Sequence, residues 1–325
     1  MVMTLSYNWL PTPTQTRNVP VTTSPIYLSE TGCPIYPQYP LAKLTSFKVG
    51  GPAQWCMNPK RIEDLQAGLI WADAEGLPVT RLGAGSNLLV SDRGLSGLVI
   101  CTRHLRHTHF DPDSGQLSVA AGEYLPRLAW AAADLGWSGL EWAVGIPGTV
   151  GGAVVMNAGA HRSCIADLLV NAHVLSPNGK LEILTPEELA YRYRTSMLQS
   201  DSRFVVRATF QLKPGYNRAD VRKLTREQMH KRRTSQPYHR PSCGSVFRNP
   251  TAHTAGWLIE QTGLKGHTIG GAQVAERHAN FILNCGGATA SDIFRLIRHV
   301  QEQVERNWQL RLEPEVRMLG EFQHV

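Results

Sequence analysis

Glycine-rich segments are the part of this sequence whose residue types and spacing can do chemistry. The run RLGAGSNLLVSD (residues 81–92) has the pattern of a strand that enters a Gly-Ala-Gly-Ser-Asn turn. Such a turn leaves backbone amides uncovered by side chains, and a nest of this kind binds phosphate oxygens. The run is not a dinucleotide-binding fingerprint, because no third glycine stands three residues after Gly85 and no helical pattern follows at once. Taken alone, the run is equally consistent with a plain tight turn.

Two further glycine-rich segments strengthen the phosphate hypothesis. TSFKVGGPA (residues 45–53) places two glycines before a proline, and GIPGTVGGAVVMNAGA (residues 145–160) adds more glycines and alanines. None of the three segments carries an obvious catalytic nucleophile. Because glycine lets a ligand approach the backbone closely, three such loops together indicate a large ligand that contains a diphosphate.

Histidine and cysteine positions predict no metal site. His104, His107 and His109 follow Cys101 at spacings that can bind a metal ion, but no carboxylate or second cysteine completes the set. The stretch leads into a DPDSG turn, so a solvated β-hairpin is the favoured interpretation. The 6 cysteines include no CxxC pair, which argues against a zinc ribbon and against a secreted disulfide framework.

As a set, the glycine-rich segments and several later motifs resemble the UDP-N-acetylenolpyruvoylglucosamine reductase family. The resemblance covers residues 44–320 in order. Each motif alone is weak, but the set is highly specific. Its later members are YRTS (193–196), RRTSQPYHRPSCGSVFRNP (232–250), AGWLIEQTGLKG (255–266), GGAQVAERHANFILN (270–284) and LEPEVRMLG (312–320).

The resemblance implies an α+β fold. Two subdomains would bind FAD in the manner of the vanillyl-alcohol-oxidase (PCMH) type, and a C-terminal α+β domain would cover the substrate. No histidine stands in a recognisable flavin-attachment motif, so noncovalent FAD is expected. The compact stretch between Tyr193 and Tyr216 resembles the shorter of the two types in this family. The cofactor-binding residues that the resemblance implies are Gly50, Gly51, Gly83, Ala84, Gly85, Ser86, Asn87, Gly145, Gly148, Thr149, Gly151, Gly152, Asn157 and Gly159.

The family reaction takes a hydride from NADPH onto flavin and passes it to the double bond of UDP-N-acetylglucosamine enolpyruvate, which gives UDP-N-acetylmuramate for peptidoglycan synthesis. Ser245 matches the family's proton donor, Arg194 the arginine that neutralises the enolate, and Glu315 an acid or enolate stabiliser opposite the serine. Arg192 and Glu313 compete for the last two roles, and spacing to neighbouring motif residues favours Arg194 and Glu315. Substrate-binding residues are expected at Arg248, Asn249, Gln261, Lys265, His278 and Asn280.

Two positions depart from the family pattern. Cys243 stands where the family usually has a small residue, and a thiol two residues before Ser245 could make the site sensitive to oxidation. His161 and Arg162 replace the aromatic residue and glycine that commonly follow the Asn-Ala-Gly-Ala segment. The second departure puts the local loop conformation in question, though not the reaction.

The elements that must position these residues mix short strands with helices. Apolar spacing predicts helices over 62–71, 124–135 and 219–233, and a last helix that begins at Ser291, a good N-cap residue. Because no regular repeat relates these elements to one another, the pattern indicates an α+β fold. Strands are predicted at 78–82, 88–90, 98–101, 117–120, 170–175, 181–184, 205–212 and 310–319.

Three regions follow from composition and pattern. Residues 1–43 carry many prolines and little periodicity, which predicts an extended or disordered leader, with a strap bound around the domain as the alternative. Residues 44–214 would form the FAD-binding domain, with subdomains at about 44–108 and 109–214. A break in composition at Pro214–Gly215 separates the C-terminal substrate-binding domain, 215–325.

Charge and hydropathy narrow the choice of partners. The net charge is +7, but the densest basic run, residues 230–233, is only four long, so anionic small molecules are favoured over nucleic acid. Because no apolar run approaches the ~18 residues of a membrane span and no signal-peptide pattern begins the chain, we expect a soluble cytoplasmic protein. We also expect a monomer, although no sequence feature bears on the oligomeric state. Two alternatives stay open. One is an oxidase of the same flavin fold acting on a hydroxy acid or sugar, and the other is a basic nucleic-acid-binding or scaffold protein without activity.

Overall fold

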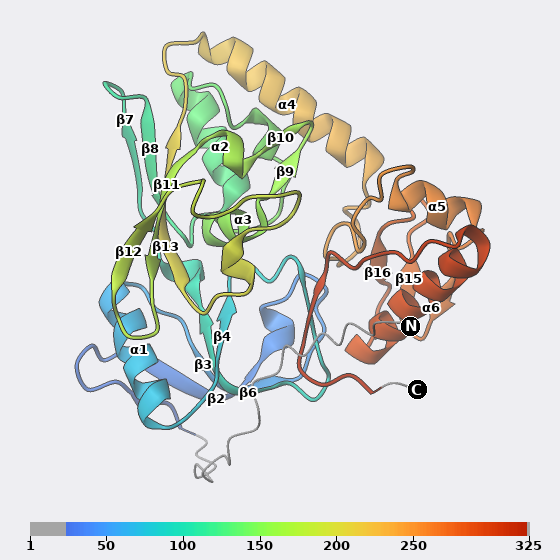
Figure 1. The fold of residues 1–325 in the computed structure, drawn as a ribbon, viewed down its shortest axis with the longest axis horizontal. Helices are drawn as coiled ribbons and strands as arrows, with labels where there is room; N and C mark the ends of the chain where they lie inside the picture. Colours follow the sequence, from blue (N-terminus) through green and yellow to red (C-terminus); the bar gives the residue numbers. More distant parts are fainter. Residues whose placement is uncertain (1–23, 324–325) are drawn as a thin grey trace, which may run out of the picture.

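Apolar side chains on five segments build the first sheet of the computed structural model, which describes residues 24–323 (Figure 1). Its last three strands are parallel to one another and its first two are antiparallel. Helix α1 (Ile62–Ala74) packs Leu65, Leu69 and Ala72 against this sheet, as its amphipathic spacing predicts. In spatial order the strands are β1 (Ile26–Tyr27), β2 (Pro34–Pro40), β3 (Pro52–Met57), β6 (Leu95–Cys101) and β4 (Val79–Leu82).

The expected leader is wrong over the part that the structure describes. Residues 24–43 are not an extension of the domain, because β2 is the second strand of the sheet and pairs with β3 from Ile35 to Pro40. Ile35 and Leu41 are fully buried and anchor this segment in the core. The prolines of β2 hide its strand character in the sequence, since proline is depleted in strands. The rest of the predicted leader lies outside the described residues.

A second, antiparallel sheet lies beside the first and carries a larger core (Figure 1). Helix α2 (Leu125–Leu135) covers it with Leu128, Ala129 and Ala132 and ends at Gly136, which is left-handed as a helix C-cap requires. The β7–β8 pair is the hairpin expected around the histidines. In spatial order the strands are β12 (Leu181–Leu184), β11 (Leu169–Leu175), β13 (Phe204–Gln211), β8 (Gln116–Ala120) and β7 (Thr108–Asp111).

The glycine-rich run at 145–160 contains a helix that the sequence did not predict. Helix α3 spans Val150–Met156 and ends at left-handed Asn157. Gly151 serves packing, because a Cβ there would lie 2.9 Å from the Cβ of Ala121. The chain then forms a small hairpin of β9 (Gly159–Ala160) and β10 (Ser163–Cys164). Single 3-10 turns lie at Leu41–Lys43, Thr102–His104, Glu141–Ala143, Ile165–Asp167 and Met197–Gln199.

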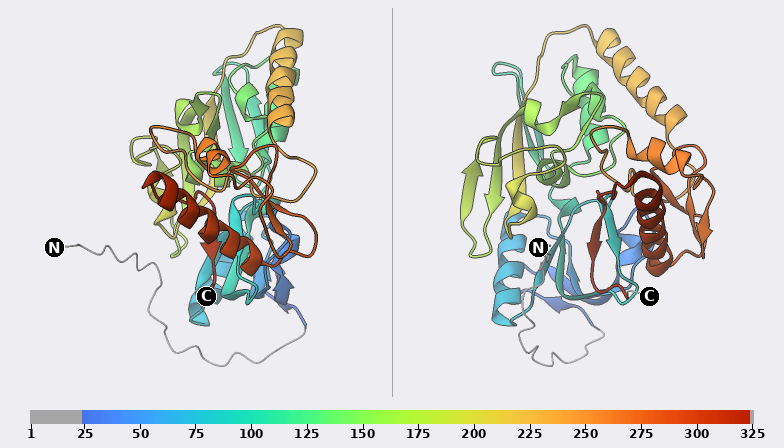
Figure 2. Two further views of the ribbon diagram at one scale, coloured as in Figure 1. Left: turned by 90° about the vertical axis from the view of Figure 1, so that its right-hand side faces the viewer. Right: turned by 45° about the vertical axis from the view of Figure 1, so that its right-hand side comes forward.

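The C-terminal domain stands beside both sheets and returns a strand to the first half of the chain (Figures 1 and 2). Strand β17 (Arg317–Leu319) pairs in parallel with β5 (Leu88–Val90), directly after the Gly-Ala-Gly-Ser-Asn turn. This pairing covers only the end of the strand expected at 310–319. The domain also contains α5 (Ala255–Gln261), β14 (Thr268–Ile269), β15 (Ala272–Val274), β16 (Ile282–Asn284) and α6 (Ala290–Trp308).

Helix α4 (Arg218–Ser235) crosses from the second sheet to the C-terminal domain (Figure 1). The sequence assigns it to the C-terminal domain, but it packs on α2, where Arg222 and Asp134 form an ion pair of 3.1 Å. Its polar sequence concealed this contact, since Val221 and Thr225 are its only fully buried residues. The expected boundary at 214 and 215 therefore precedes a helix that still belongs structurally to the second subdomain.

The last long helix begins two residues earlier than predicted. The N-cap of α6 is Thr289, whose hydroxyl accepts a bond from the amide of Asp292, while the Asp292 carboxylate accepts from the Thr289 amide. This reciprocal capping box identifies the start more reliably than a lone serine does. The Ser291 hydroxyl instead donates to Asp92 at 2.7 Å. Within residues 24–323, no helix is long and apolar enough to cross a membrane.

Candidate active site

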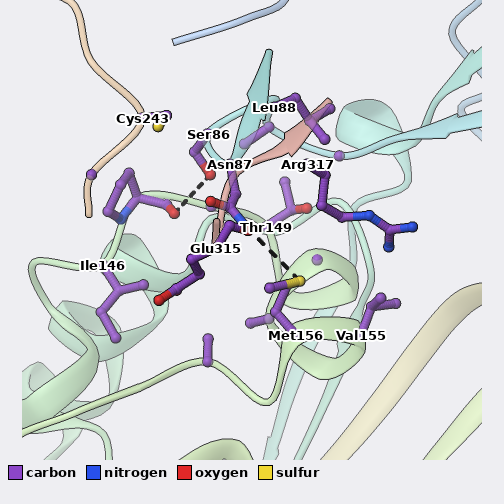
Figure 3. A pocket seen from close by; sticks show the side chains of 18 of the residues that line it. Ser86, Asn87, Leu88, Ile146, Thr149, Val155, Met156, Cys243, Glu315 and Arg317 are labelled. Carbon is purple, nitrogen blue, oxygen red and sulfur yellow. Dashed lines mark hydrogen bonds between the residues drawn. The ribbon is translucent and has the colours of Figure 1, made fainter. Parts of the chain in front are cut away.

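A cavity of about 620 Å³ lies where the two sheets and the C-terminal domain meet (Figure 3). Its walls come from the turn after β4, the α3 segment, the turn at 192–195, the loop at 243–249 and the β17 segment. The cavity brings together all three residues predicted to carry the chemistry, Ser245, Arg194 and Glu315, with most of the predicted cofactor residues.

The two glycine-rich walls face each other across the cavity and are joined at their edges (Figure 3). Ser86 Oγ donates to the carbonyl of Pro147 at 2.9 Å, and Asn87 Nδ2 lies 4.0 Å from Met156 Sδ. Behind the turn, Arg103 donates to the carbonyls of Gly83 and Ala84. Within the described chain the amides of residues 84–87 form no hydrogen bond, so they remain to bind an anion.

The walls fit the phosphate-bearing cofactor that the sequence predicts. Thr149 Oγ1 is buried at the cavity and has no hydrogen-bond partner among residues 24–323. A Cβ on Gly83 would stand 2.7 Å from that oxygen, so a side chain there would obstruct the wall. A buried hydroxyl without a partner is costly, and a ligand that accepts or donates a bond here removes the cost.

Arg194 stands in a strained turn. Arg192 and Thr195 exchange backbone hydrogen bonds of 3.0 and 3.1 Å, which places Tyr193 and Arg194 at the tip. Arg194 has φ +54°, a left-handed conformation that glycine usually occupies at the third position of such a turn. Strain of this kind costs on the order of 1–3 kcal/mol and is concentrated at functional sites.

Arg194 and Glu315 form a partly buried ion pair. Arg194 Nε donates to Glu315 Oε1 at 3.1 Å, and Nη2 donates to the Gly159 carbonyl at 2.6 Å. Burial raises the pKa of Glu315, while the charges of Arg194 and Arg248 act in the opposite direction. Glu315 thus holds a proton to higher pH than an exposed glutamic acid does.

The structure separates Glu315 from its competitor Glu313. The sequence predicted both on one face of a strand, but β17 begins only at Arg317. The Glu313 side chain is 68% exposed and pairs with Arg248, whereas the Glu315 side chain is 16% exposed. Arg192 likewise lies outside the cavity walls, while Arg194 lines them.

Ser245 lies on a loop that is fixed by hydrogen bonds to the segment that contains Asn280 and Phe281. Gly244 precedes it with φ +83°, and Ser245 forms an antiparallel bridge to Phe281. Asn280 fixes Phe247, two residues further along the loop. The Asn280 side chain accepts a hydrogen bond from the Phe247 amide at 2.9 Å and donates one to the Phe247 carbonyl at 2.8 Å. The Ser245 hydroxyl itself has no protein hydrogen bond within residues 24–323, so it is available to a ligand.

Some predicted cofactor residues shape the site without lining it. Gly50 and Gly51 pack on the β5 region, where a Cβ on Gly51 would lie 2.2 Å from the Asp92 carbonyl oxygen. Gly145 packs in the same way under Arg232. Asn157 supports the arginine turn, because its Nδ2 donates to the Arg192 carbonyl at 3.1 Å. The residues that line the cavity as predicted are Gly83, Ala84, Gly85, Ser86, Asn87, Gly148, Thr149, Gly151, Gly152 and Gly159.

Of the predicted substrate-binding residues, Asn249 lines the cavity. Arg248, Gln261, Lys265, His278 and Asn280 do not. The Asn280 side chain is hydrogen-bonded to Phe247 on the loop that carries Ser245, and Lys265 forms an ion pair with Glu260 at 2.7 Å. These residues lie in or near the motifs of the C-terminal domain, but the fold leaves their side chains outside the cavity wall.

Two arginines in the cavity wall were missed from the sequence. Arg317 and Arg81 line the cavity, and burial lowers the pKa of each guanidinium. Arg81 donates to the Arg203 carbonyl at 2.5 Å, and Arg317 donates to the Gln199 carbonyl at 3.3 Å. Buried cations bound mainly to carbonyls favour an anionic ligand. Arg81 stands on the strand that enters the Gly-Ala-Gly-Ser-Asn turn, which is visible in the sequence, whereas Arg317 reaches the cavity only through the pairing of β17 with β5.

The two departures from the family pattern, Cys243 and the pair His161 and Arg162, have separate structural consequences. Cys243 is buried, and burial together with nearby Glu315 raises the pKa of its thiol. A buried, protonated thiol is a poor target for oxidation, so the structure does not support the expected sensitivity. His161 and Arg162 form the tip of the β9–β10 hairpin with φ +53° and +67°, and His161 lines the cavity.

Comparisons with known proteins agree with this architecture. Residues 53–185 match the model of an FAD binding domain family, and residues 236–319 match that of the UDP-N-acetylenolpyruvoylglucosamine reductase C-terminal domain. The chain is 64% identical to UDP-N-acetylenolpyruvoylglucosamine reductase from a Nostoc species, over 92% of this chain and 90% of that protein. It is 55% identical to the Synechocystis protein of that name, over 94% and 98%. The crystal structure of the Thermus caldophilus reductase superposes with a TM-score of 0.77 at 36% identity, over 89% of this chain and all of that chain.

Proposed function

The chain belongs to the UDP-N-acetylenolpyruvoylglucosamine reductase family, and we propose that Ser245, Arg194 and Glu315 carry the proton-transfer half of its reaction. It is an FAD-dependent oxidoreductase that reduces UDP-N-acetylglucosamine enolpyruvate to UDP-N-acetylmuramate in peptidoglycan synthesis. The observation that supports the proposed roles most directly is the shared cavity. The three side chains lie in one wall system with the two glycine-rich loops.

The glycine-rich walls would hold FAD by its phosphates. The free amides of residues 84–87, with Arg81 and Arg317 nearby, supply donors and positive charge for the diphosphate, and Thr149 offers its unused hydroxyl. Bound FAD supplies the redox chemistry of the site, with NADPH as the proposed source of the hydride that reaches the enolpyruvyl double bond. Reduction of that double bond then leaves a proton to be delivered by the protein.

The proton transfer depends on the positive charge of Arg194, whose guanidinium is already fixed by other groups of the site. When hydride adds to one carbon of the double bond, negative charge develops on the carbon beside the carboxylate. Arg194 stabilises this charge because its guanidinium is fixed by Glu315 and by the Gly159 carbonyl before substrate arrives. The Ser245 hydroxyl gives its proton to the developing carbanion, and the resulting alkoxide recovers a proton from solvent.

Glu315 has two roles in this scheme. As a carboxylate it orients Arg194 through the 3.1 Å bond to Nε. Its raised pKa also lets it hold a proton near the reacting atoms at a pH where an exposed glutamic acid would have lost it. It therefore tunes the charge around the enolate opposite the serine.

Replacement of the serine tests the proposed roles. In Ser245→Ala, anaerobic reduction of bound FAD by NADPH should proceed at the wild-type rate, because no proton donor is needed there. Reoxidation of the reduced enzyme by the enolpyruvyl sugar should slow by roughly 10²–10⁴-fold, the usual contribution of a positioned proton donor. Stopped-flow absorbance follows both half-reactions separately.

Ser242→Ala is the matched control, since Ser242 precedes the same loop but does not line the cavity. It should keep both rates. Equal loss of the two half-reactions in Ser245→Ala would remove Ser245 from the role of proton donor. A wild-type enzyme whose reduced flavin is reoxidised by oxygen but not by the enolpyruvyl sugar would instead favour the oxidase alternative.

We also propose that the protein works as a cytoplasmic monomer that takes NADPH and the UDP-sugar as its partners. The six cysteines are free thiols in the structure, which suits a reducing compartment. Both proposed substrates are anionic nucleotides, in agreement with the net charge of +7. Sedimentation at micromolar concentration measures the oligomeric state, and a dimer would contradict this part of the proposal.

A further inference from the structure

Gln199 is the point at which the turn that carries Arg194 is attached to the remainder of the site. It is the last residue of the 3-10 turn Met197–Gln199 and is half-buried. Its side-chain Nε2 donates to the Arg194 carbonyl at 2.8 Å, with a longer contact of 3.3 Å to the Val155 carbonyl on α3.

The bond from Gln199 acts on the strained peptide. A left-handed residue turns its carbonyl in a direction that an extended or helical residue does not, and Arg194 is left-handed at φ +54°. The only other donor to that carbonyl within residues 24–323 is Arg248 Nη2, at 3.5 Å, which is a long and weak bond. Gln199 is therefore the main polar contact that favours this conformation.

The backbone carbonyl of Gln199 is held by an arginine of strand β17. Arg317 Nη2 donates to the Gln199 carbonyl at 3.3 Å. The Arg317 amide donates to the Asn87 carbonyl, and Asn87 Nδ2 donates to the Glu315 carbonyl at 3.0 Å. One set of hydrogen bonds thus connects the main chains of Arg194 and of its ion-pair partner Glu315 to the Gly-Ala-Gly-Ser-Asn turn.

We propose that Gln199 is a positioning residue that keeps the Arg194 backbone in its left-handed conformation and so aims the guanidinium at Glu315 and at the enolate. This inference rests on the proposed role of Arg194. Without the amide, the turn relaxes toward an unstrained conformation, and the guanidinium loses its fixed place while the remainder of the fold is retained. Misplacement of a catalytic group by about 1 Å can cost on the order of 10²-fold in rate.

The test uses the full-length FAD-bound enzyme and the variant Gln199→Met, which keeps the length of the side chain and removes its donor. NADPH should reduce the flavin at the wild-type rate. Reoxidation by UDP-N-acetylglucosamine enolpyruvate should slow by roughly 10- to 100-fold, because Arg194 acts in that half-reaction. Gln211→Met is the matched control. Gln211 also donates to the carbonyls of a turn, at 3.1–3.2 Å, but that turn lies at the far end of the second sheet, and this variant should keep both rates.

A double-mutant cycle with Arg194→Met distinguishes positioning from general destabilisation. If Gln199 acts through Arg194, Gln199→Met should slow reoxidation no further in the Arg194→Met background. The inference is overturned if Gln199→Met reoxidises like the wild type, or if its effect is undiminished in the Arg194→Met background. If Arg194→Met itself reoxidises like the wild type, the proposed role of Arg194 fails, and this inference fails with it.

Discussion

At the scale of single residues, the proposed proton transfer depends on a few buried charges and one available hydroxyl. Arg194 and Glu315 form an ion pair with each other, and both line the cavity in which a carboxylate-bearing substrate would lie. Ser245 supplies a proton but no charge, which suits transfer to a strongly basic carbanion. The site thus stores positive charge and a proton donor without an uncompensated buried ion.

Arg248 influences the pKa of Glu315 although it does not line the cavity. Its positive charge lowers the pKa of that carboxyl against the dominant effect of burial. Arg248→Met removes a cation that favours the carboxylate, so the pKa of Glu315 should rise further. Whichever form of Glu315 the reaction needs, the corresponding limb of the pH–rate profile for reoxidation should move to higher pH.

Glu313→Gln is the control for that shift. It removes the ion-pair partner of Arg248 but leaves the Arg248 charge in place, so the limb should not move to higher pH. An unchanged profile in Arg248→Met would show that this arginine does not influence Glu315.

At the scale of elements, the sequence was most informative where side-chain periodicity is strong. The helices α1, α2 and α4 and the strands β4, β5, β6, β8, β11, β12 and β13 were all predicted within a few residues. Several short elements were missed, among them β1, β3, α5 and the strands β14, β15 and β16. For two of the missed elements the physical reason is plain. The prolines of β2 disguise a strand, and the glycines of α3 disguise a helix whose close packing requires small residues.

Contacts between distant segments could not be read from the sequence. The capping of α6 by Asp92, the position of Arg81 and Arg317 in the cavity wall, and the separation of Glu313 from Glu315 all depend on tertiary placement. The three residues proposed to act on substrate were chosen because their motifs resemble a known family. Residues chosen only for lying near those motifs, such as Gln261 and His278, were mostly placed elsewhere by the fold.

The β9–β10 hairpin stores strain that a single substitution should relieve. Arg162 has φ +67° in a two-residue turn that favours glycine or asparagine. Arg162→Gly should raise the free energy of unfolding by about 0.5–1 kcal/mol, measured by urea denaturation. Gly179→Ala provides the converse comparison, because Gly179 has φ +79° with open space around it and the added methyl group should destabilise. A destabilised Arg162→Gly would contradict the conformation described for this turn.

At the scale of the whole molecule, the C-terminal domain is joined to the FAD-binding half by specific polar bonds. Asp92 accepts bonds of 2.8 Å from the amides of Ala290 and Ser291 at the start of α6. Asn284, buried in the C-terminal domain, donates to the Phe47 carbonyl at 3.0 Å. Phe47, Val49 and Leu89 also belong to the core of that domain. These contacts fix the position of the domain that carries Ser245 relative to the glycine-rich walls of the cavity.

Loss of the Asp92 cap should weaken this junction. Asp92→Ala leaves two amides at the start of α6 without their acceptor and removes a negative charge from the helix N-terminus. The free energy of unfolding should fall by about 1–2 kcal/mol, seen as a lower urea midpoint. Asp113→Ala, in the exposed β7–β8 turn, should change it by less than half as much. Equal effects would show that Asp92 does not hold the two halves together.

One cavity would bind FAD and direct its electrons to an enolpyruvyl sugar. The visible absorption of the purified protein tests it most directly, first with NADPH added without oxygen and then with UDP-N-acetylglucosamine enolpyruvate. We predict a flavin spectrum that bleaches with NADPH and returns when the enolpyruvyl sugar is added. A protein that binds no flavin even after incubation with FAD, or whose bleached flavin does not respond to the enolpyruvyl sugar, would contradict the account.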